Sequence, residues 1–197
     1  VRRFPAVIHA RYSSPLQSGA DPVLRRMRRW HTREAYRRRT LEIVGRVPVL
    51  GLGADVITGF PAETEADHMD TRTLIEELPF TYLHVFPFSP RDGTPGAELN
   101  ARAPVPQRVS AERARELRSL VASKAERYRS LRAGGRAEVT LEGDGNVGLT
   151  GDYLRVRVAG GPVGETRDGG LGRLHRGVLR AVEADLHIDL AAPSASI

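Results

Sequence analysis

The sequence predicts an α/β domain followed by a small antiparallel β-barrel. Residues 47–58 and 80–88 are apolar or aromatic runs with a helical pattern between them, the strand–helix–strand order of a parallel sheet. From about residue 136 onward, short β-prone runs alternate with glycine turns, which is typical of a small barrel. We therefore expect one domain over residues 1–133 and a second over residues 134–197.

Apolar spacing and capping residues predict the first elements in chain order. We expect a strand and loop over residues 1–19, a short helix near residues 21–29, and a longer helix from Thr32 as N-cap to about residue 44. Residues 47–58 are mostly apolar with little alternation, which predicts a strand buried on both faces.

Thr64, followed by acidic residues, predicts the start of the next helix. Its expected apolar face consists of Met69, Thr73, Leu74 and Leu78. Residues 80–88 predict a second strand, and residues 89–106 a polar, proline-rich connection. A long helix is expected over residues 110–132, ended by Gly134, and its apolar stripe consists of Ala114, Leu117, Val121, Tyr128 and Leu131.

The glycine-rich stretch GLGADVITGFPAETEADH, residues 51–68, poses a choice between a cofactor loop and a plain turn. A dinucleotide fingerprint is disfavoured because the third glycine of Gly-x-Gly-x-x-Gly is missing and strand residues continue after the first two. We instead expect the turn Gly59–Phe60–Pro61 to lie at the carboxyl end of a strand, where parallel α/β folds bind ligands. The acids Glu63, Asp67 and Asp70 could serve an enzyme directly, but they fit the electrostatics of a helix start better.

Composition limits the possible partners and cofactors. Of the 30 basic residues, Lys124 is the single lysine, and arginine suits phosphate contacts, so the net charge of +6 favours a nucleic-acid partner. A coding bias towards arginine explains the same numbers equally well. With no cysteine, the chain cannot hold a disulfide, a thiolate zinc site or a cysteine-bound cluster. No apolar run is long enough for a membrane span, so we expect a cytoplasmic protein without a membrane partner.

Four segments, PLQSGAD, RRMRRWHTREAY, GADVITGFPAETEADH and LPFTYLHVFPFSPRDGTPGAEL, occur in an order and spacing that resemble one family. They are similar to the latter part of the radical S-adenosylmethionine domain of the methylthiotransferases, a partial (β/α) barrel. The tail from about residue 136, with LEG and GLTGDYLRVRV, resembles the TRAM domain, a small OB-like RNA-binding barrel. The stretch YLHVFPFSPRDGTP is most similar to the branch that acts on threonylcarbamoyladenosine in tRNA.

The resemblance implies an S-adenosylmethionine site at the carboxyl ends of the barrel strands. The residues matched to that site are Gln17, Ser18, Asp55, Gly59, Phe60, Pro61, Val85 and Phe86. Plain alternatives stay open: Val85 and Phe86 as core, and Asp55 as a cap or ion-pair partner. His9 and His84 fit structural roles better than metal ligation, because neither has a second ligand at a useful spacing.

The implied nucleic-acid partner is tRNA. Arg91 lies at the expected mouth of the site, although it could instead anchor its own loop. In the barrel, Arg155 and Arg157 share a strand face, with Arg173 and Arg176 nearby, and these four could follow a phosphate backbone or form a merely solvated face.

One departure from the family limits what this chain could do. Relatives hold two [4Fe–4S] clusters through cysteines, and we expect those motifs to lie upstream of Val1. The leading hypothesis is the C-terminal portion of a tRNA methylthiotransferase, inactive by itself, which would contribute to adding a methylthio group next to the anticodon. The rival hypothesis is a non-catalytic RNA-binding remnant.

Overall fold

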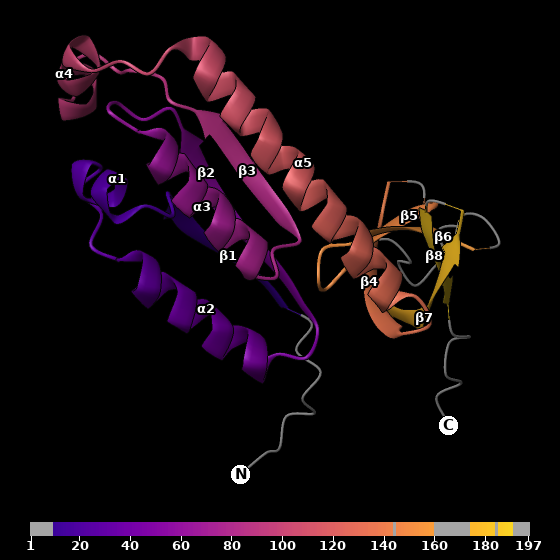
Figure 1. The fold of residues 1–197 in the computed structure, drawn as a ribbon. Helices are drawn as coiled ribbons and strands as arrows, with labels where there is room; N and C mark the ends of the chain where they lie inside the picture. Colours follow the sequence, from indigo (N-terminus) through magenta and orange to yellow (C-terminus); the bar gives the residue numbers. More distant parts are fainter. Residues whose placement is uncertain (1–9, 144, 160–173, 184, 191–197) are drawn as a thin grey trace. The chain divides into compact units, whose positions relative to one another are not determined.

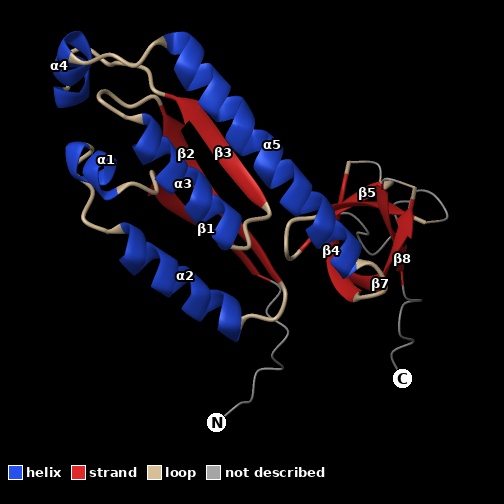
Figure 2. Ribbon diagram, viewed as in Figure 1, coloured by secondary structure: helices blue, strands red, loops and turns tan. Residues whose placement is uncertain are grey.

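The computed structural model describes residues 10–143, 145–159, 174–183 and 185–190, and the chain forms two compact units. The first unit comprises Tyr12–Pro48 and Leu52–Ala125, and the second is built mainly from Glu126 onward. Figure 1 shows the elements along the chain, and Figure 2 distinguishes helices from strands.

The first unit contains a three-stranded sheet in the order β1-β2-β3. Its strands are β1 (Ala10–Gln17), β2 (Leu50–Thr58) and β3 (Tyr82–Pro87). β2 and β3 pair in parallel, with a register that runs from Gly53 beside Tyr82 to Thr58 beside Pro87. The predicted parallel strand–helix–strand unit is confirmed.

Five helices accompany the sheet. They are α1 (Asp21–Arg26), α2 (Arg33–Arg46), α3 (Glu65–Glu77), α4 (Pro95–Arg102) and α5 (Gln107–Arg132). Figure 1 shows α2, α3 and α5 along the same side of the three strands. In the part of the chain that the structure describes, these three helices therefore cover one face of the sheet.

Threonine caps determine where three helices begin. Thr32 accepts a hydrogen bond from the Ala35 amide at 3.2 Å, and Thr64 accepts one from the Asp67 amide at 3.1 Å, as the sequence predicts. The Asp67 carboxylate also accepts from the Thr64 amide at 3.0 Å, which completes a capping box. Thr94 caps α4 in the same way, so the polar, proline-rich connection predicted over residues 89–106 contains a helix that was not predicted.

The predicted burial of β2 is only half right. Leu50 to Ala54 are buried, but from Asp55 onward buried residues alternate with half-buried ones. The helices cover only one face of the sheet, so the side chains of Asp55 and Ile57 reach the other face.

The predicted apolar face of α3 is right for Leu74 and Leu78, which are fully buried, and wrong for Met69 and Thr73. Met69 and Thr73 are exposed, whereas the polar residues His68 and Thr71 are buried with Leu74. His68 and Thr71 tolerate burial because each has a hydrogen-bond partner, Glu116 for His68 at 2.7 Å. Polar residues with partners cannot be recognised from hydrophobic spacing alone.

The predicted stripe of α5 is confirmed over most of its length. Ala114, Leu117 and Val121 are buried, and Tyr128 packs against the core of the second unit. Leu131 is 77% exposed, so its assignment to the stripe is wrong. The buried residue at this end of the helix is Arg132, four residues after Tyr128 and so on the same side of the helix.

The second unit contains a closed five-stranded barrel in the order β4-β5-β6-β8-β7. Its strands are β4 (Arg136–Glu142), β5 (Val147–Thr150), β6 (Arg155–Val158), β7 (Leu174–Val182) and β8 (Asp185–Leu190). Alternate residues point inward, and Val139, Leu179 and Ile188 are fully buried. The barrel is not wholly antiparallel as predicted, because β6 and β8 pair in parallel.

Among the residues that the structure describes, no helix combines the length and the apolar character needed to cross a membrane.

Candidate functional site

A pocket of about 580 Å³ lies in the first unit, where the three strands end. It is lined by Gln17, Arg29, Asp55, Ile57, Phe86, Pro87, Phe88, Ser89, Arg91 and Thr94. Four of the residues expected at the ligand or its mouth, Gln17, Asp55, Phe86 and Arg91, therefore meet in one place.

Strand alternation explains why side chains from β2 and β3 meet in this pocket. Asp55 and Ile57 alternate with the buried Val56, and Ile57 pairs in register with Phe86. Neighbouring residues of a parallel pair project from the same face, so Phe86 stands beside Ile57. Phe86 is 54% exposed and lies with Ile57 and Phe88 in the lining, so the pocket has a continuous apolar part.

The opposite wall of the pocket is basic. Arg29 donates a hydrogen bond through Nη2 to Oε1 of Gln17 at 3.3 Å. Gln17 has a left-handed backbone, with φ of 65°, where it ends β1. Arg91 is exposed, and its backbone carbonyl accepts a hydrogen bond from the Thr94 hydroxyl at 2.7 Å. One carboxylate, two guanidinium groups and aromatic rings suit a ligand that carries both charges and a flat ring.

The turn at Gly59 and Phe60 supports the pocket from behind. Neither these residues nor Pro61 lines it. The Phe60 ring is buried and meets the Phe88 ring edge-on at a centroid distance of 5.0 Å, and Phe88 lines the pocket. The predicted contact residues of this turn are thus placed one layer behind the lining.

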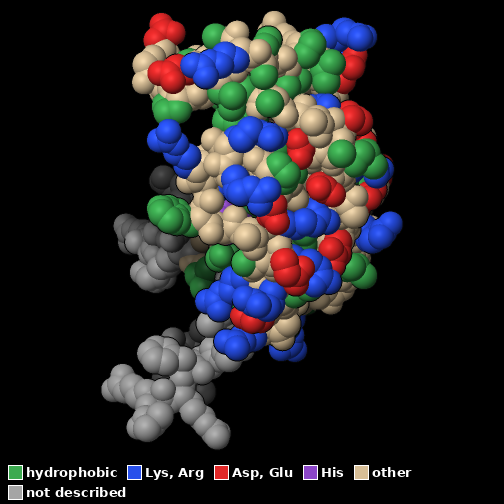
Figure 3. All heavy atoms as spheres, turned by 60° about the vertical axis from the view of Figure 1, so that its left-hand side comes forward, with side chains coloured by type: hydrophobic (Ala, Val, Ile, Leu, Met, Phe, Trp, Pro, Cys, Tyr) green, Lys and Arg blue, Asp and Glu red, His purple; other side chains and the backbone are tan. Residues whose placement is uncertain are grey.

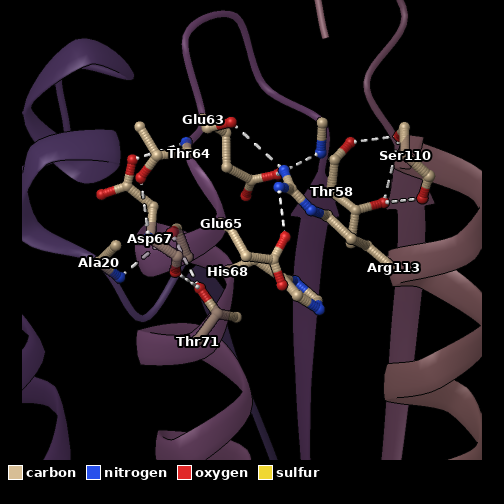
Figure 4. A network of polar contacts seen from close by, with 12 residues as sticks. Ala20, Thr58, Glu63, Thr64, Glu65, Asp67, His68, Thr71, Ser110 and Arg113 are labelled. Atoms are coloured by element: carbon tan, nitrogen blue, oxygen red, sulfur yellow. Dashed lines mark hydrogen bonds and ion pairs between the residues drawn. The ribbon is translucent and has the colours of Figure 1, made fainter. Parts of the chain in front are cut away.

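A buried ion pair holds this turn (Figure 4). Glu63 accepts a hydrogen bond from the Gly59 amide at 2.7 Å and pairs with Arg113 of α5 at 2.8 Å. Arg113 also reaches Glu65 at 2.9 Å. Burial raises the pKa of the Glu63 carboxyl above its usual value, although the Gly59 amide and Arg113 act in the opposite direction.

Figure 4 also shows a second set of bonds that ties the end of β2 to α5. The Ser110 hydroxyl donates to the Thr58 carbonyl at 2.8 Å, and the Thr58 hydroxyl donates to the Ser110 carbonyl at 3.1 Å. Glu63 and Asp67 both have structural partners, Arg113 and Arg26, so their positions explain these acids without a direct catalytic role.

Two other predicted site residues lie away from the pocket lining. Ser18 is buried, and its hydroxyl is 3.2 Å from the Thr71 hydroxyl. Val85 is buried, and its carbonyl accepts a bond from Arg118 at 2.6 Å. Val85 therefore follows its core alternative. His84 is exposed, and the described residues contain no group of three or more His, Asp or Glu side chains suited to a metal ion.

The arginines expected to bind RNA lie on the barrel surface of the second unit. Arg155 and Arg157 are exposed on one face of β6, as predicted, and line a hollow of about 450 Å³ with Arg129. Acids pair with them: Glu142 lies 3.5 Å from Arg155, and Asp185 lies 3.1 Å from Arg157.

The structure describes only one of the two other barrel arginines that were expected to bind RNA. Arg176 is exposed and pairs with Glu138 at 3.0 Å, while Arg173 lies outside the described residues. Figure 3 shows the same mixing of charges more widely, with basic side chains next to acidic ones over much of the visible face.

Sequence comparison identifies relatives for this chain, although no protein-family model matches it. It is 38% identical over 150 residues to the threonylcarbamoyladenosine tRNA methylthiotransferase of Bacillus subtilis, across 72% of this chain. The enzymes of the same name from Rickettsia prowazekii and Aquifex aeolicus are 36% and 32% identical across 73% and 74% of the chain. The chain belongs to the threonylcarbamoyladenosine tRNA methylthiotransferase family. It spans about a third of the length of these relatives, with 33% to 35% of each covered.

The sequence did not indicate several of the residues that line the two hollows. Arg29 and Phe88 line the pocket, and Arg129 joins the barrel arginines. Arg29 lies three residues after the last residue of α1, so its place beside Gln17 depends on how that helix ends. Alternation from Phe86 in the FPF sequence could have indicated Phe88.

Proposed function

We propose that this chain is the C-terminal portion of a tRNA methylthiotransferase that acts on threonylcarbamoyladenosine next to the anticodon. Its first unit would supply one wall of an S-adenosylmethionine site, as the end of a partial radical S-adenosylmethionine barrel. Its second unit would be a TRAM-type barrel that binds tRNA. The observation that carries this proposal is the pocket that gathers Gln17, Asp55, Phe86 and Arg91 at the strand ends.

The side chains of the pocket fit the chemistry of S-adenosylmethionine. The ligand has an adenine ring, ribose hydroxyls, a sulfonium cation and an amino acid end with both charges. Phe86 and Ile57 offer apolar surface to the adenine, Asp55 offers an acceptor for cationic groups or hydroxyls, and a guanidinium suits the carboxylate. A pocket of about 580 Å³ is large enough for such a molecule.

The residues of this chain would bind and orient the ligand. When bound in a complete enzyme, S-adenosylmethionine supplies the radical source and the methyl group. With no cysteine, the chain offers no thiolate to a [4Fe–4S] cluster, so the proposal assigns cluster ligation to none of its residues. Arg29 would hold Gln17 in place at one side of the site, and Asp55 would accept hydrogen bonds at the other.

Calorimetric titration with S-adenosylmethionine tests the pocket. Loss of a charge-assisted hydrogen bond from Asp55→Asn should weaken binding roughly 10-fold to 100-fold. The matched control is Asp70→Asn, which changes an exposed acid of α3 outside the pocket lining. Equal weakening by both variants, or no difference between Asp55→Asn and wild type, would contradict the assignment.

Filter binding with tRNA tests the barrel. If arginines contact phosphates, affinity should fall as salt rises, and Arg157→Gln should lower the salt slope by about 1. The control is Arg180→Gln. Arg180 is a barrel arginine that pairs with Asp189 on β8 and does not line the hollow formed by Arg129, Arg155 and Arg157. A salt-independent affinity, or none at low salt, would count against RNA binding.

The two titrations together separate the proposal from its rival, a non-catalytic RNA-binding remnant. Both functions require RNA binding, but only the methylthiotransferase portion requires the pocket to take S-adenosylmethionine. The convergence of Asp55, Phe86 and Arg91 favours the first, because RNA binding by the barrel gives no reason for that pocket.

A further inference from the structure

Trp30 is the most conspicuous side chain outside the sites described so far. It lies in the connection between α1 and α2 and is fully exposed, at 102% of its reference area. It is also the only tryptophan in the chain. A ring of this size gains nothing for folding when water surrounds it, and both of its faces are accessible to a partner that could stack on them.

The loop that carries Trp30 is fixed by the way in which α1 ends. The Arg29 amide donates to the Leu24 carbonyl at 2.9 Å and the Arg28 amide to the Arg25 carbonyl at 3.0 Å, which is the Schellman pattern. Arg28 occupies the left-handed position of this motif, with φ of 56°, where glycine is the usual residue. An exposed arginine in a conformation that favours glycine points to a use for its side chain.

The surroundings of Trp30 are cationic. Arg25, Arg28 and Arg29 are all exposed, and among the residues that the structure describes no acidic side chain pairs with any of them. These arginines differ from Arg155 and Arg157 of the barrel, which have acidic partners. Arg29 also lines the pocket, so the loop lies at its mouth.

We propose that the loop of residues 28–30 is a stacking platform for an unpaired base of RNA, with Arg28 contacting the adjoining phosphate. An aromatic ring next to unpaired cations is the arrangement that binds single-stranded nucleic acid, since every base has a flat face and every linkage a negative charge. The position of Arg29 between Trp30 and the pocket would bring the unpaired bases to the ligand site. This inference rests on the proposed RNA function and names the surface that the unpaired nucleotides contact.

The intrinsic fluorescence of Trp30 gives a direct test with the full chain. Addition of an RNA stem–loop should quench the emission, because the bases of its loop are free to stack, whereas fully paired RNA of the same length should quench much less. Trp30→Ala should weaken binding of the stem–loop roughly 5-fold to 150-fold, and Trp30→Phe should retain most of the affinity. Met69→Ala removes another exposed apolar side chain of the same unit and should leave binding unchanged.

Arg28→Gly separates function from folding at the same loop. Glycine relieves the left-handed backbone, so the melting temperature should stay the same or rise. Binding should nevertheless weaken, and the salt slope should fall by about 1.

Two results would contradict the proposal, and they differ in what they say about the RNA function. If wild type binds the stem–loop while Trp30 shows no quenching and Trp30→Ala binds equally well, the platform is overturned and the RNA function stands. If wild type binds no RNA even at low salt, the RNA function itself fails, and the platform with it.

Discussion

Gly59→Ala should destabilise the turn behind the pocket by two separable effects. Gly59 has φ of 71°, a region that costs a residue with a Cβ atom about 1–2 kcal/mol. The new Cβ would also lie 2.4 Å from both Cβ and Oγ of Ser110, and overpacking of this kind costs roughly 1–3 kcal/mol. We therefore expect the unfolding free energy of the first unit to fall by about 2–5 kcal/mol.

A second glycine of the same unit isolates the backbone effect. Gly93 has φ of 74° and no atom within 4 Å of the position its Cβ would take. Gly93→Ala should therefore cost only the backbone penalty of about 1–2 kcal/mol. Ser110→Gly should relieve the steric part, so that Gly59→Ala costs less in that background than in wild type.

Urea unfolding followed by circular dichroism measures these differences. Equal losses from Gly59→Ala and Gly93→Ala would show that Ser110 does not press on the turn. A change below about 0.5 kcal/mol at Gly59, the size of an ordinary surface substitution, would refute the account of the turn altogether.

Three further predictions concern stability. Asp152→Asn should cost about 3–5 kcal/mol of unfolding free energy, because it removes the charge that pairs with the buried Arg132 at 2.8 Å. Burial raises the pKa of Asp152, but the hydrogen bonds from Arg132, Tyr128 and Thr150 together with the charge of Arg132 outweigh burial, so the net pKa is lowered. Wild type should therefore lose this stabilisation as pH falls below the usual aspartate range, and Asp152→Asn should show less of that loss when unfolding is measured against pH. Burial raises the pKa of Tyr36 to about 12, so its contribution is present below pH 10 and lost as pH rises towards 12, a decline that Tyr36→Phe should remove. Leu131→Ala should change the unfolding free energy by less than about 0.5 kcal/mol, since Leu131 is exposed. A larger loss of stability in a thermal melt would show that Leu131 is buried after all.

Local chemistry made the helix starts predictable from sequence. Thr32 and Thr64 cap their helices because a hydroxyl oxygen can accept from an amide two or three residues ahead, and this needs no tertiary contact. Thr94 carries the same signal with Pro95 at the first helical position, so α4 could have been predicted as well. The proline-rich composition around it hid that signal.

Burial was less predictable because it depends on what covers each surface. Asp55 and Ile57 belong to an apolar run, which suggests burial on both faces of the sheet. The helices pack on one side of the sheet only, however, and the two side chains line the pocket on the other side. His68 is buried although its neighbours in sequence suggest an exposed face, because Glu116 of α5 reaches it. That partner is 48 residues away in the chain and follows no periodicity.

The sequence predicted where the pocket lies better than it predicted which side chains line it. The family resemblance matched Gln17, Asp55 and Phe86 to a site at the strand ends, and these three side chains line one pocket there. Gly59 and Phe60 belong to the same strand end but turn back under the pocket, where Glu63 holds the Gly59 amide. Motif position cannot distinguish a residue that touches a ligand from one that supports the residue touching it.

The arginine content alone does not show which arginines are available to bind phosphate. The structure separates arginines that have acidic partners from arginines that have none among the described residues. Arg155 and Arg157 have acidic partners, but exposed pairs contribute only about 0–1 kcal/mol each, so phosphate could replace those partners at small cost. Arg28 needs no such exchange, because no acid pairs with it among the described residues. Binding at the barrel should therefore show a smaller net gain per arginine than binding at the Trp30 loop. Arg28→Gln should accordingly weaken RNA binding more than Arg155→Gln does, and the reverse order would place the main RNA contact on the barrel.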